Sequence, residues 1–563
     1  MTARPFQVLA AGALTLALVA GAGVLRADEA VDWTMIGKIR DEGFHRSQVM
    51  KTLAHLTDTI GPRLTGSPQM KQANDWTRQQ LEEWGLKNAH LESFDFGRGW
   101  SFTRASVQMI APHEVPLLAL PEAWTQGTEG PVRGEVIKVK IGSKDDFEQY
   151  RGKLEGKILL LEDPGDGHGP PGRPSPDDPT RRLTAQDLEE MGSFEIPSER
   201  AGEWRKRYQK RRELRKAIAE FLIEEKALAT LSKSSRDNGI VRVAAGGSRE
   251  VDDPKAITGL MLSAEHFQRI ERFLDDDQKV ELEIDVAARF HEDSTEAYNT
   301  VAEIPGGDLK DQVVMCGAHL DSWHAGTGAT DNGAGSAVMM EAVRILKALG
   351  VKPRRTIRIG LWAGEEQGLL GSRAYVKEHF ASRPEPPEGE DANPFEERWP
   401  LTVKPEHAKL SVYFNLDNGS GKVRGVYAQE NSGVVPIFRA WLEPFADLGA
   451  DTVTQRNTGG TDHQAFDAVG LPGFQMIQDP LDYFSKTHHT NLDVLDLVEA
   501  DDLKQASVIL ASFLYDAAMR DQMMPRKPLP QEPPKPKQAD PKKTADPEAA
   551  NQDGGADHGD AHH

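Results

Sequence analysis

The sequence predicts an α/β protein with a largely parallel, mixed sheet sandwiched by helices and a smaller α/β domain inserted into it. Three observations support this prediction. From residue 280 to residue 520, short apolar runs typical of strands alternate with segments of helical periodicity. These runs are apolar throughout, as expected for parallel strands that helices cover on both faces. Between residues 116 and 279 the alternation is interrupted, which indicates a separate folding unit.

The main domain is predicted to have two parts, residues 28–115 and 280–520. Its expected central strands are "DQVVMCGAHLD", "RTIRIGLWAG", "KLSVYFNLD" and "GLPGFQMIQ". Its first part starts with two helical patterns, and the turn "GPRLTGSP" lies between them. The inserted domain, 116–279, has the strand runs "GEVIKVK" and "GKILLLED" and a helix with nine Lys or Arg between Arg200 and Lys216. We interpret this basic helix as a solvated face rather than an anion-binding surface.

Both ends of the sequence differ from the rest. Residues 1–27 hold an early cation and a long apolar run with small residues after it, which is typical of an export signal, and an uncleaved membrane anchor is the alternative. With the signal cleaved, we expect no stable association with a membrane. Residues 521–563 contain eight prolines and no aromatic residue, so they are predicted to be disordered. The sequence does not indicate an oligomeric state.

Composition excludes some functions. The formal charge of −21 makes nucleic acid an unfavourable partner. With Cys316 as the only cysteine, no disulfide within the chain is possible, and packing must supply the stability. Because Cys316 lies in an apolar run, we interpret it as a buried strand residue, although a weak soft ligand is an alternative.

Residues with metal-binding chemistry follow the predicted strands. His319 and Asp321 leave the first strand and, two positions apart, lie on one face, so Asp321 is expected to hydrogen-bond the His319 ring and fix its tautomer. Asp331 follows in the glycine-rich "TDNGAG", where its two oxygens can each contact a different metal ion. Glu365 and Glu366 are adjacent after the second strand, so that one can bind a metal ion while the other accepts a proton from water.

The third and fourth strands add further candidates. Asp417 follows the third strand, and "DYFSKTHHTNLD" after the fourth supplies His488 and His489, with Asp493 four residues further on. Ligand sites of open α/β sheets lie beyond the carboxyl ends of the strands, so these side chains are expected to meet. A set of imidazoles and carboxylates without cysteine suits a hydrolytic zinc site, with Co²⁺ or Mn²⁺ as possible substitutes.

The combination of "HLDSW", "TDNGAG", "WAGEEQGLLGS", "NLDNG" and "HHTNLD" resembles the co-catalytic two-zinc metallopeptidases, which include bacterial leucyl aminopeptidases and plasma glutamate carboxypeptidase. The resemblance is close from about 290 to 520 and loose from about 46 to 110. It implies a zinc-peptidase fold, two zinc ions per chain and a peptide substrate. The inserted region resembles the protease-associated domain of relatives.

The resemblance also implies roles for single residues. His319, Asp331 and Asp417 would hold one zinc ion, while Asp331, Glu366 and His489 would hold the other. Glu365 would be the general base and Asp321 the orienting residue. His488 is the alternative to His489, which is preferred because Asp493 follows it four residues on. The loop "GGTDHQAFDAVGLPGF" resembles family loops near the substrate, with three candidate residues in it: Thr461, Asp462 and His463.

These expectations point to an exported aminopeptidase or dipeptidase. A carboxypeptidase or another amide hydrolase on the same metal site is one alternative. A non-catalytic, receptor-like relative is another, which the complete set of candidate ligands disfavours.

Overall fold

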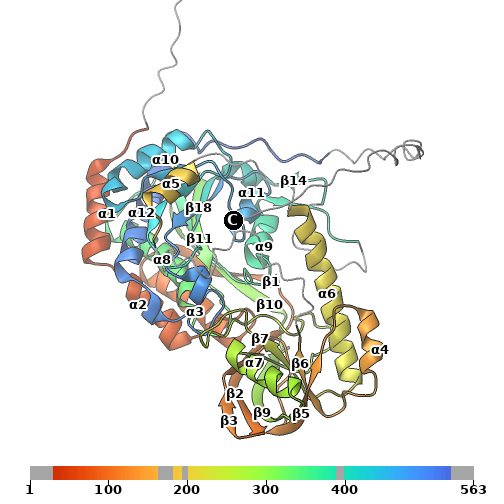
Figure 1. Ribbon diagram of the computed structural model, residues 1–563. Coiled ribbons are helices and arrows are strands. Elements are labelled where there is room, and N and C mark those ends of the chain that lie inside the picture. Colours follow the sequence, from red (N-terminus) through yellow and green to blue (C-terminus); the bar gives the residue numbers. More distant parts are fainter. Residues whose placement is uncertain (1–28, 163–181, 193–200, 388–397, 534–563) are drawn as a thin grey trace, which may run out of the picture.

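The computed structural model describes residues 29–162, 182–192, 201–387 and 398–533, with the backbone alone from 201 to 212. These residues form two eight-stranded sheets, a small two-stranded one, and helices packed around them (Figure 1). The predicted α/β class is therefore confirmed. The predicted export signal lies outside the described residues. Within the described ranges, no helix combines the length and apolar character needed to cross a membrane.

The main sheet has the strand order β1-β10-β12-β11-β15-β18-β16-β17. The four predicted strands are its centre, β12, β11, β15 and β18, and each neighbouring pair among them is parallel. β10 and β16 continue the sheet antiparallel on either side. The sheet is thus mixed with a parallel centre, as predicted. Its strands span Lys87–Asp95 (β1), Glu296–Ile304 (β10), Leu309–His319 (β11), Arg355–Trp362 (β12), Leu410–Asn415 (β15), Val423–Tyr427 (β16), Thr452–Thr454 (β17) and Gly473–Gln478 (β18).

Helices cover this sheet. α8 and α12 pack on each other and on the central strands, with α1 and α2 beside them, while α9 and α11 contact each other and pack on β10 and β15 respectively. The helices span Trp33–His45 (α1), Val49–Ala54 (α2), Pro68–Glu83 (α3), Ala334–Ala348 (α8), Leu370–His379 (α9), Val435–Leu442 (α10), His463–Asp467 (α11) and Ala500–Met519 (α12).

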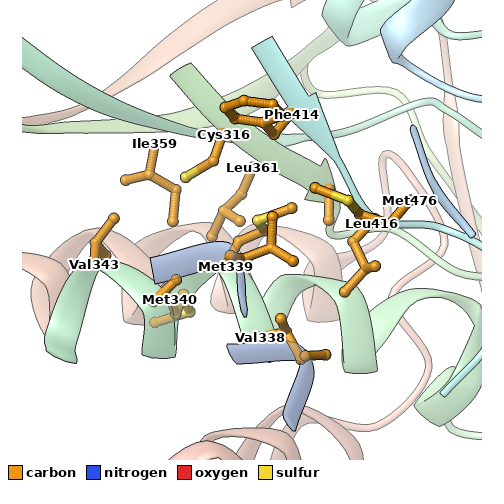
Figure 2. Close-up of a cluster of buried hydrophobic side chains, with 14 of the residues drawn as sticks. Cys316, Val338, Met339, Met340, Val343, Ile359, Leu361, Phe414, Leu416 and Met476 are labelled. Carbon is orange, nitrogen blue, oxygen red and sulfur yellow. The ribbon is translucent and has the colours of Figure 1, made fainter. Parts of the chain in front are cut away.

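Cys316 lies in the core between the main sheet and α8. Figure 2 shows its thiol among Ile359, Leu361 and Phe414 of the neighbouring strands, facing the α8 side chains. It is fully buried, and burial raises the pKa of the thiol. The interpretation of Cys316 as a buried strand residue agrees with this position, which is surrounded by apolar side chains rather than by metal-binding groups.

The second sheet, with the order β3-β2-β9-β5-β6-β7-β8-β4, is wider than the predicted insertion of residues 116–279. β2 and β9 lie outside those bounds, yet they pair antiparallel along almost their whole length. The reason is that β2 and β9 connect the two sheets, β2 following β1 and β9 preceding β10. The strands span Gly99–Ala111 (β2), Val115–Leu117 (β3), Ala119–Pro121 (β4), Val132–Val139 (β5), Lys157–Leu161 (β6), Ala229–Lys233 (β7), Thr258–Leu262 (β8) and Glu281–His291 (β9).

Not every helix of the inserted region packs against the second sheet. The basic segment forms α6, Ala201–Glu224, and the apolar end of α6 packs beside α4, Phe147–Tyr150. α7, Ala264–Asp275, packs on β5 and β7. α5, Ala185–Gly192, instead packs on β17 of the main sheet. Before it, Arg182 lies 3.1 Å from the buried Asp479 carboxylate, which ties the insertion to the main domain.

The prediction of a disordered tail from residue 521 is wrong for residues 521–533. Met524 is 2% exposed, and its backbone N–H donates to Ser411 Oγ at 3.1 Å. The Arg526 guanidinium donates to the backbone carbonyl of His407, and Lys527 forms an ion pair with Asp467. Proline-rich composition does not reveal such contacts, because one buried methionine and two cations are enough to hold the segment. The remaining residues, 534–563, lie outside the described part of the chain.

We therefore expect Met524→Ala to lower the thermal unfolding midpoint. Truncating a buried methionine costs about 2–5 kcal/mol, since the apolar contacts are lost and a cavity remains. Calorimetry of the full chain would measure the change. Met523→Ala is the matched control, because Met523 is only partly buried and should matter less. Equal midpoints for both variants and the unmodified chain would contradict the docking of this segment.

Candidate metal centre

The candidate ligands follow the carboxyl ends of adjacent parallel strands. His319 is the last residue of β11, and Asp331 lies in the short π-helix Ala329–Gly333 that leads into α8. Glu365 and Glu366 lie in the turn between β12 and α9, and Asp417 lies two residues after β15. Because these strand ends share one edge of the sheet, the side chains converge there, as the sequence predicted.

One group of side chains surrounds His319 Nε2. This nitrogen lies 3.4 Å from Asp331 Oδ1 and 3.3 Å from Asp417 Oδ1. All three residues are buried, and one possible ligand atom from each lies within 4.8 Å of the others. Glu365 Oε2 is 3.9 Å from the same nitrogen, at the margin of the group.

A second group surrounds His489 Nε2, which lies 2.9 Å from Glu366 Oε2 and 3.3 Å from Asp331 Oδ2. Asp331 therefore faces one group with Oδ1 and the other with Oδ2. His488 stacks on His489 with ring centroids 3.7 Å apart, but its Nε2 is 4.0 Å from Asp331 Oδ2. His489 is thus better placed than His488 to bind a metal ion together with Asp331 and Glu366.

Both groups contain polar atoms that protein neighbours do not satisfy. Among the described residues, buried atoms without a hydrogen-bond partner include one from each of four candidate ligands: His319 Nε2, Asp331 Oδ2, Glu366 Oε1 and Asp417 Oδ1. Buried polar groups are rarely left unpaired, so such a cluster indicates an additional binding partner. Nitrogen and carboxylate donors without sulfur fit a divalent cation such as zinc.

The electrostatics of the cluster also favour a cation. Burial raises the pKa of Glu366 well above its usual value, and the negative charges of Asp331 and Glu365 add to this effect. Burial also raises the pKa of Glu365, and the negative charges of Asp417 and Asp462 add to this effect. Burial opposes protonation of His319, but the surrounding carboxylates outweigh it and raise the pKa of His319. Carboxylates gathered out of water repel one another, and positive charge between them relieves this repulsion.

Asp321 orients the site in a different way from the one expected. His319 Nδ1 donates to the backbone carbonyl of Asp321 at 3.0 Å, whereas the Asp321 carboxylate is 3.6 Å from that nitrogen. Since a carbonyl only accepts, Nδ1 carries a proton, which leaves Nε2 as the ring nitrogen that can bind a metal ion. The carboxylate itself accepts from Thr65 Oγ1 at 2.9 Å and from the Glu365 N–H at 3.3 Å.

Residues 299–514, which include both groups, match the family model described as peptidase family M28. The segment that carries the candidate ligands therefore resembles this peptidase family. The chain is a metallopeptidase. Mouse carboxypeptidase Q is 26% identical over 499 residues, 88% of this chain and 90% of the relative.

Two solved structures share the fold of this metallopeptidase. An M28 peptidase precursor from Shewanella amazonensis has a TM-score of 0.62 and 24% identity, with 89% of this chain and 99% of that chain covered. A zinc aminopeptidase from Bacillus subtilis has a TM-score of 0.53 and 18% identity, with 84% and 95% covered. At these identities the similarity establishes the fold alone.

In this metallopeptidase Asp493 fixes the loop that carries Asp331. Its Oδ1 accepts from the Thr330 N–H at 2.6 Å and from Thr330 Oγ1 at 2.8 Å, and its Oδ2 accepts from the Asp331 N–H at 3.3 Å. Burial and the nearby Asp331 raise the pKa of Asp493 to about 7. The sequence singled out Asp493 because it follows His489 by four residues. In the structure its carboxylate instead holds the backbone of Asp331 and the residue before it.

The inserted region also reaches the metal centre, which no sequence pattern indicated. Arg242 pairs with Thr490 in an isolated antiparallel bridge, and the Val243 N–H donates to the His489 carbonyl at 3.0 Å. Arg242 Nη2 lies 2.9 Å from His489 Nδ1. Tyr483, also missed, lies close enough to Asp331 to lower the pKa of its carboxyl. Sequence reasoning missed these residues because single arginines and tyrosines carry no recognisable pattern.

The three residues of the predicted substrate loop are all buried at the start of α11. Thr461 Oγ1 accepts from Asn415 Nδ2 at 2.9 Å, and His463 Nε2 lies 3.0 Å from the Thr458 carbonyl. Burial raises the pKa of Asp462 to about 7. The structure therefore places these side chains in the interior, close enough to His319 and Asp417 for Asp462 to interact with their charges. Contact with substrate stays a prediction.

The geometry gives a direct test between the two adjacent histidines. His489→Ala is expected to lose the metal ion held with Glu366 and most activity, because its Nε2 contacts both carboxylates. His488→Ala, the matched control, should keep the metal. Elemental analysis of both purified variants measures the difference. The reverse result would assign the ligand to His488.

Proposed function

We propose that this metallopeptidase is an exported exopeptidase that uses two zinc ions to remove N-terminal residues or to cleave dipeptides. The observation that carries the proposal is the position of Asp331, whose two carboxylate oxygens face two separate ligand groups. His319, Asp331 and Asp417 would bind one ion, and Asp331, Glu366 and His489 the other. Co²⁺ or Mn²⁺ could substitute, since these donors do not discriminate strongly among such ions.

The catalytic step that we propose centres on Glu365. Zinc, when bound, lowers the pKa of a water molecule toward neutrality and polarises the peptide carbonyl. Glu365 lies at the edge of the first group, 3.9 Å from His319 Nε2, where its carboxylate can accept the proton of the attacking water. It would then give that proton to the leaving amine. Its burial, which raises its pKa, suits a group that both accepts and returns a proton.

Cleavage at the carboxyl terminus is the second candidate, favoured by the similarity to mouse carboxypeptidase Q along 88% of the chain. A dipeptide satisfies both, since its single bond adjoins both termini.

A substrate panel with the zinc-loaded enzyme would distinguish these functions. The panel contains one free dipeptide, its N-acetylated form, its C-terminal amide, and a longer peptide. An aminopeptidase cleaves the amide but not the acetylated form, and a carboxypeptidase does the reverse. A strict dipeptidase cleaves only the free dipeptide. Two bound zinc ions with no hydrolysis of any substrate would support a receptor-like protein and contradict the proposal.

Export and the nature of the inserted region belong to the same proposal. N-terminal sequencing of the protein from the extracytoplasmic fraction should show cleavage near residue 27, whereas an intact N-terminus in the membrane fraction would support the anchor. We interpret the inserted region as a protease-associated domain. Its contact with the His489 loop supports a role beside the active site.

A further inference from the structure

The turn "GPRLTGSP" comes more than 250 residues before the metal centre in the sequence, yet it contacts the centre directly. It lies between the π-helix His55–Ile60 and α3. Thr65 Oγ1 donates to Asp321 Oδ2 at 2.9 Å and accepts from the Gly364 N–H at 2.9 Å. One hydroxyl therefore joins the segment after β11 to the segment after β12.

These bonds form a closed network. The Glu365 N–H donates to the other oxygen of Asp321 at 3.3 Å, so both Gly364 and Glu365 are held through the pair Thr65 and Asp321. Asp321 in turn accepts from the His319 ring through its backbone carbonyl. Thr65 and Asp321 are both fully buried, so water does not compete for these bonds. The network thereby links the proposed base, Glu365, to the ligand His319.

The turn is itself held in place by Arg63, which is fully buried. The Arg63 guanidinium donates to five backbone carbonyls. Three of them, Leu320, Thr327 and Gly328, lie in the segment that carries Asp321 and leads to Asp331. Gly66 has a φ of +79° and lies against Gly99, where a Cβ would be 2.8 Å from the Gly99 Cα. This close approach fixes the backbone next to Thr65.

We propose that Thr65 is a positioning residue for peptide hydrolysis, holding the Glu365 backbone at a fixed place relative to Asp321 and His319. Thr65 touches neither a ligand atom of the metal groups nor, on this proposal, the substrate. It acts through Asp321 and through the turn that precedes Glu365. The inference rests on the proposed function, since it needs Glu365 to act in catalysis.

The test compares Thr65→Val with Thr65→Ser in the full-length, zinc-loaded enzyme. Valine keeps the shape but removes the hydroxyl, and serine restores it. Groups that support an active site typically change activity by about 10–100-fold when they are replaced. We expect Thr65→Val to lower kcat by about that factor with KM and zinc content unchanged, and Thr65→Ser to recover most of kcat. A purely structural role would lower the unfolding midpoint without this split between kcat and KM.

Thr77→Val is the matched control, because Thr77 is equally buried and its hydroxyl bonds to the Ala73 carbonyl, away from the metal centre. It should leave kcat unchanged. If Thr65→Val does not fold, Thr65→Ala removes the same hydroxyl without the added methyl group. Wild-type kcat in Thr65→Val, or equal losses in the valine and serine variants, would overturn the role of Thr65 alone. Absence of any hydrolysis by the zinc-loaded wild type would overturn the proposed function, and this inference with it.

Discussion

Glu365→Gln is expected to lower kcat by about 10²–10⁴-fold, the range typical of a lost general base, while the zinc content stays that of the wild type. Glutamine has nearly the shape of glutamate but cannot accept a proton. The metal should remain, because Glu365 is 3.9 Å from His319 Nε2 and is not one of the carboxylates in closest contact with either histidine. Kinetics on a free dipeptide and elemental analysis of the same sample measure both quantities.

The neighbouring residue supplies the control for this prediction. Glu366 Oε2 lies 2.9 Å from His489 Nε2, so Glu366→Gln should weaken binding of one zinc ion rather than remove a proton acceptor. The two substitutions are at adjacent residues, and each removes one negative charge. A Glu365→Gln enzyme with wild-type kcat, or with less zinc than Glu366→Gln, would show that the roles of the pair are reversed or absent.

The sequence predicted the ligand cluster because a simple rule connects position in the sequence to position in space. Parallel strands deliver their carboxyl ends to one edge, so His319, Glu365 and Asp417 had to lie near one another once the strands were recognised. The pairing of β12 with β11 and of β11 with β15 realises this rule. This rule does not predict the position of His489, because His489 lies in a loop well after the end of β18. The motif "HHTNLD", rather than geometry, indicated His489 as a ligand.

The parts that the sequence did not reveal depend on contacts between distant segments. Thr65, Arg63 and Arg242 reach the metal centre from outside the strands that carry the ligands. No local periodicity reports such contacts. The predicted bounds of the inserted domain, 116–279, leave out β2 and β9 for the same reason, because the pairing of these two strands is a long-range property. The segment 521–533 was predicted to be disordered from its proline-rich composition. Composition does not reveal the few side chains of this segment that pack on the main domain.

Asp331→Ala is expected to remove both zinc ions and to reduce hydrolysis to background. Asp331 is the one candidate ligand of the described groups whose two oxygens face both histidines, Oδ1 toward His319 and Oδ2 toward His489. Asp417→Ala is the matched comparison, since Asp417 contacts the first group only and should cost one ion. Zinc analysis after dialysis against metal-free buffer measures the stoichiometry. Loss of a single ion from Asp331→Ala would contradict the bridging position.

Thermal unfolding separates loss of metal from damage to the fold. A ligand that binds only the folded state stabilises it, by about 4 kcal/mol when its concentration is 1,000 times Kd, so a chelator should lower the unfolding midpoint of the wild type. The midpoint of Asp331→Ala should not respond to the chelator. It should also be no lower than that of the metal-free wild type, because removing one of several buried carboxylates reduces their mutual repulsion. A variant less stable than the metal-free wild type would instead mean that Asp331 supports the fold through its own contacts with His319 and Tyr483.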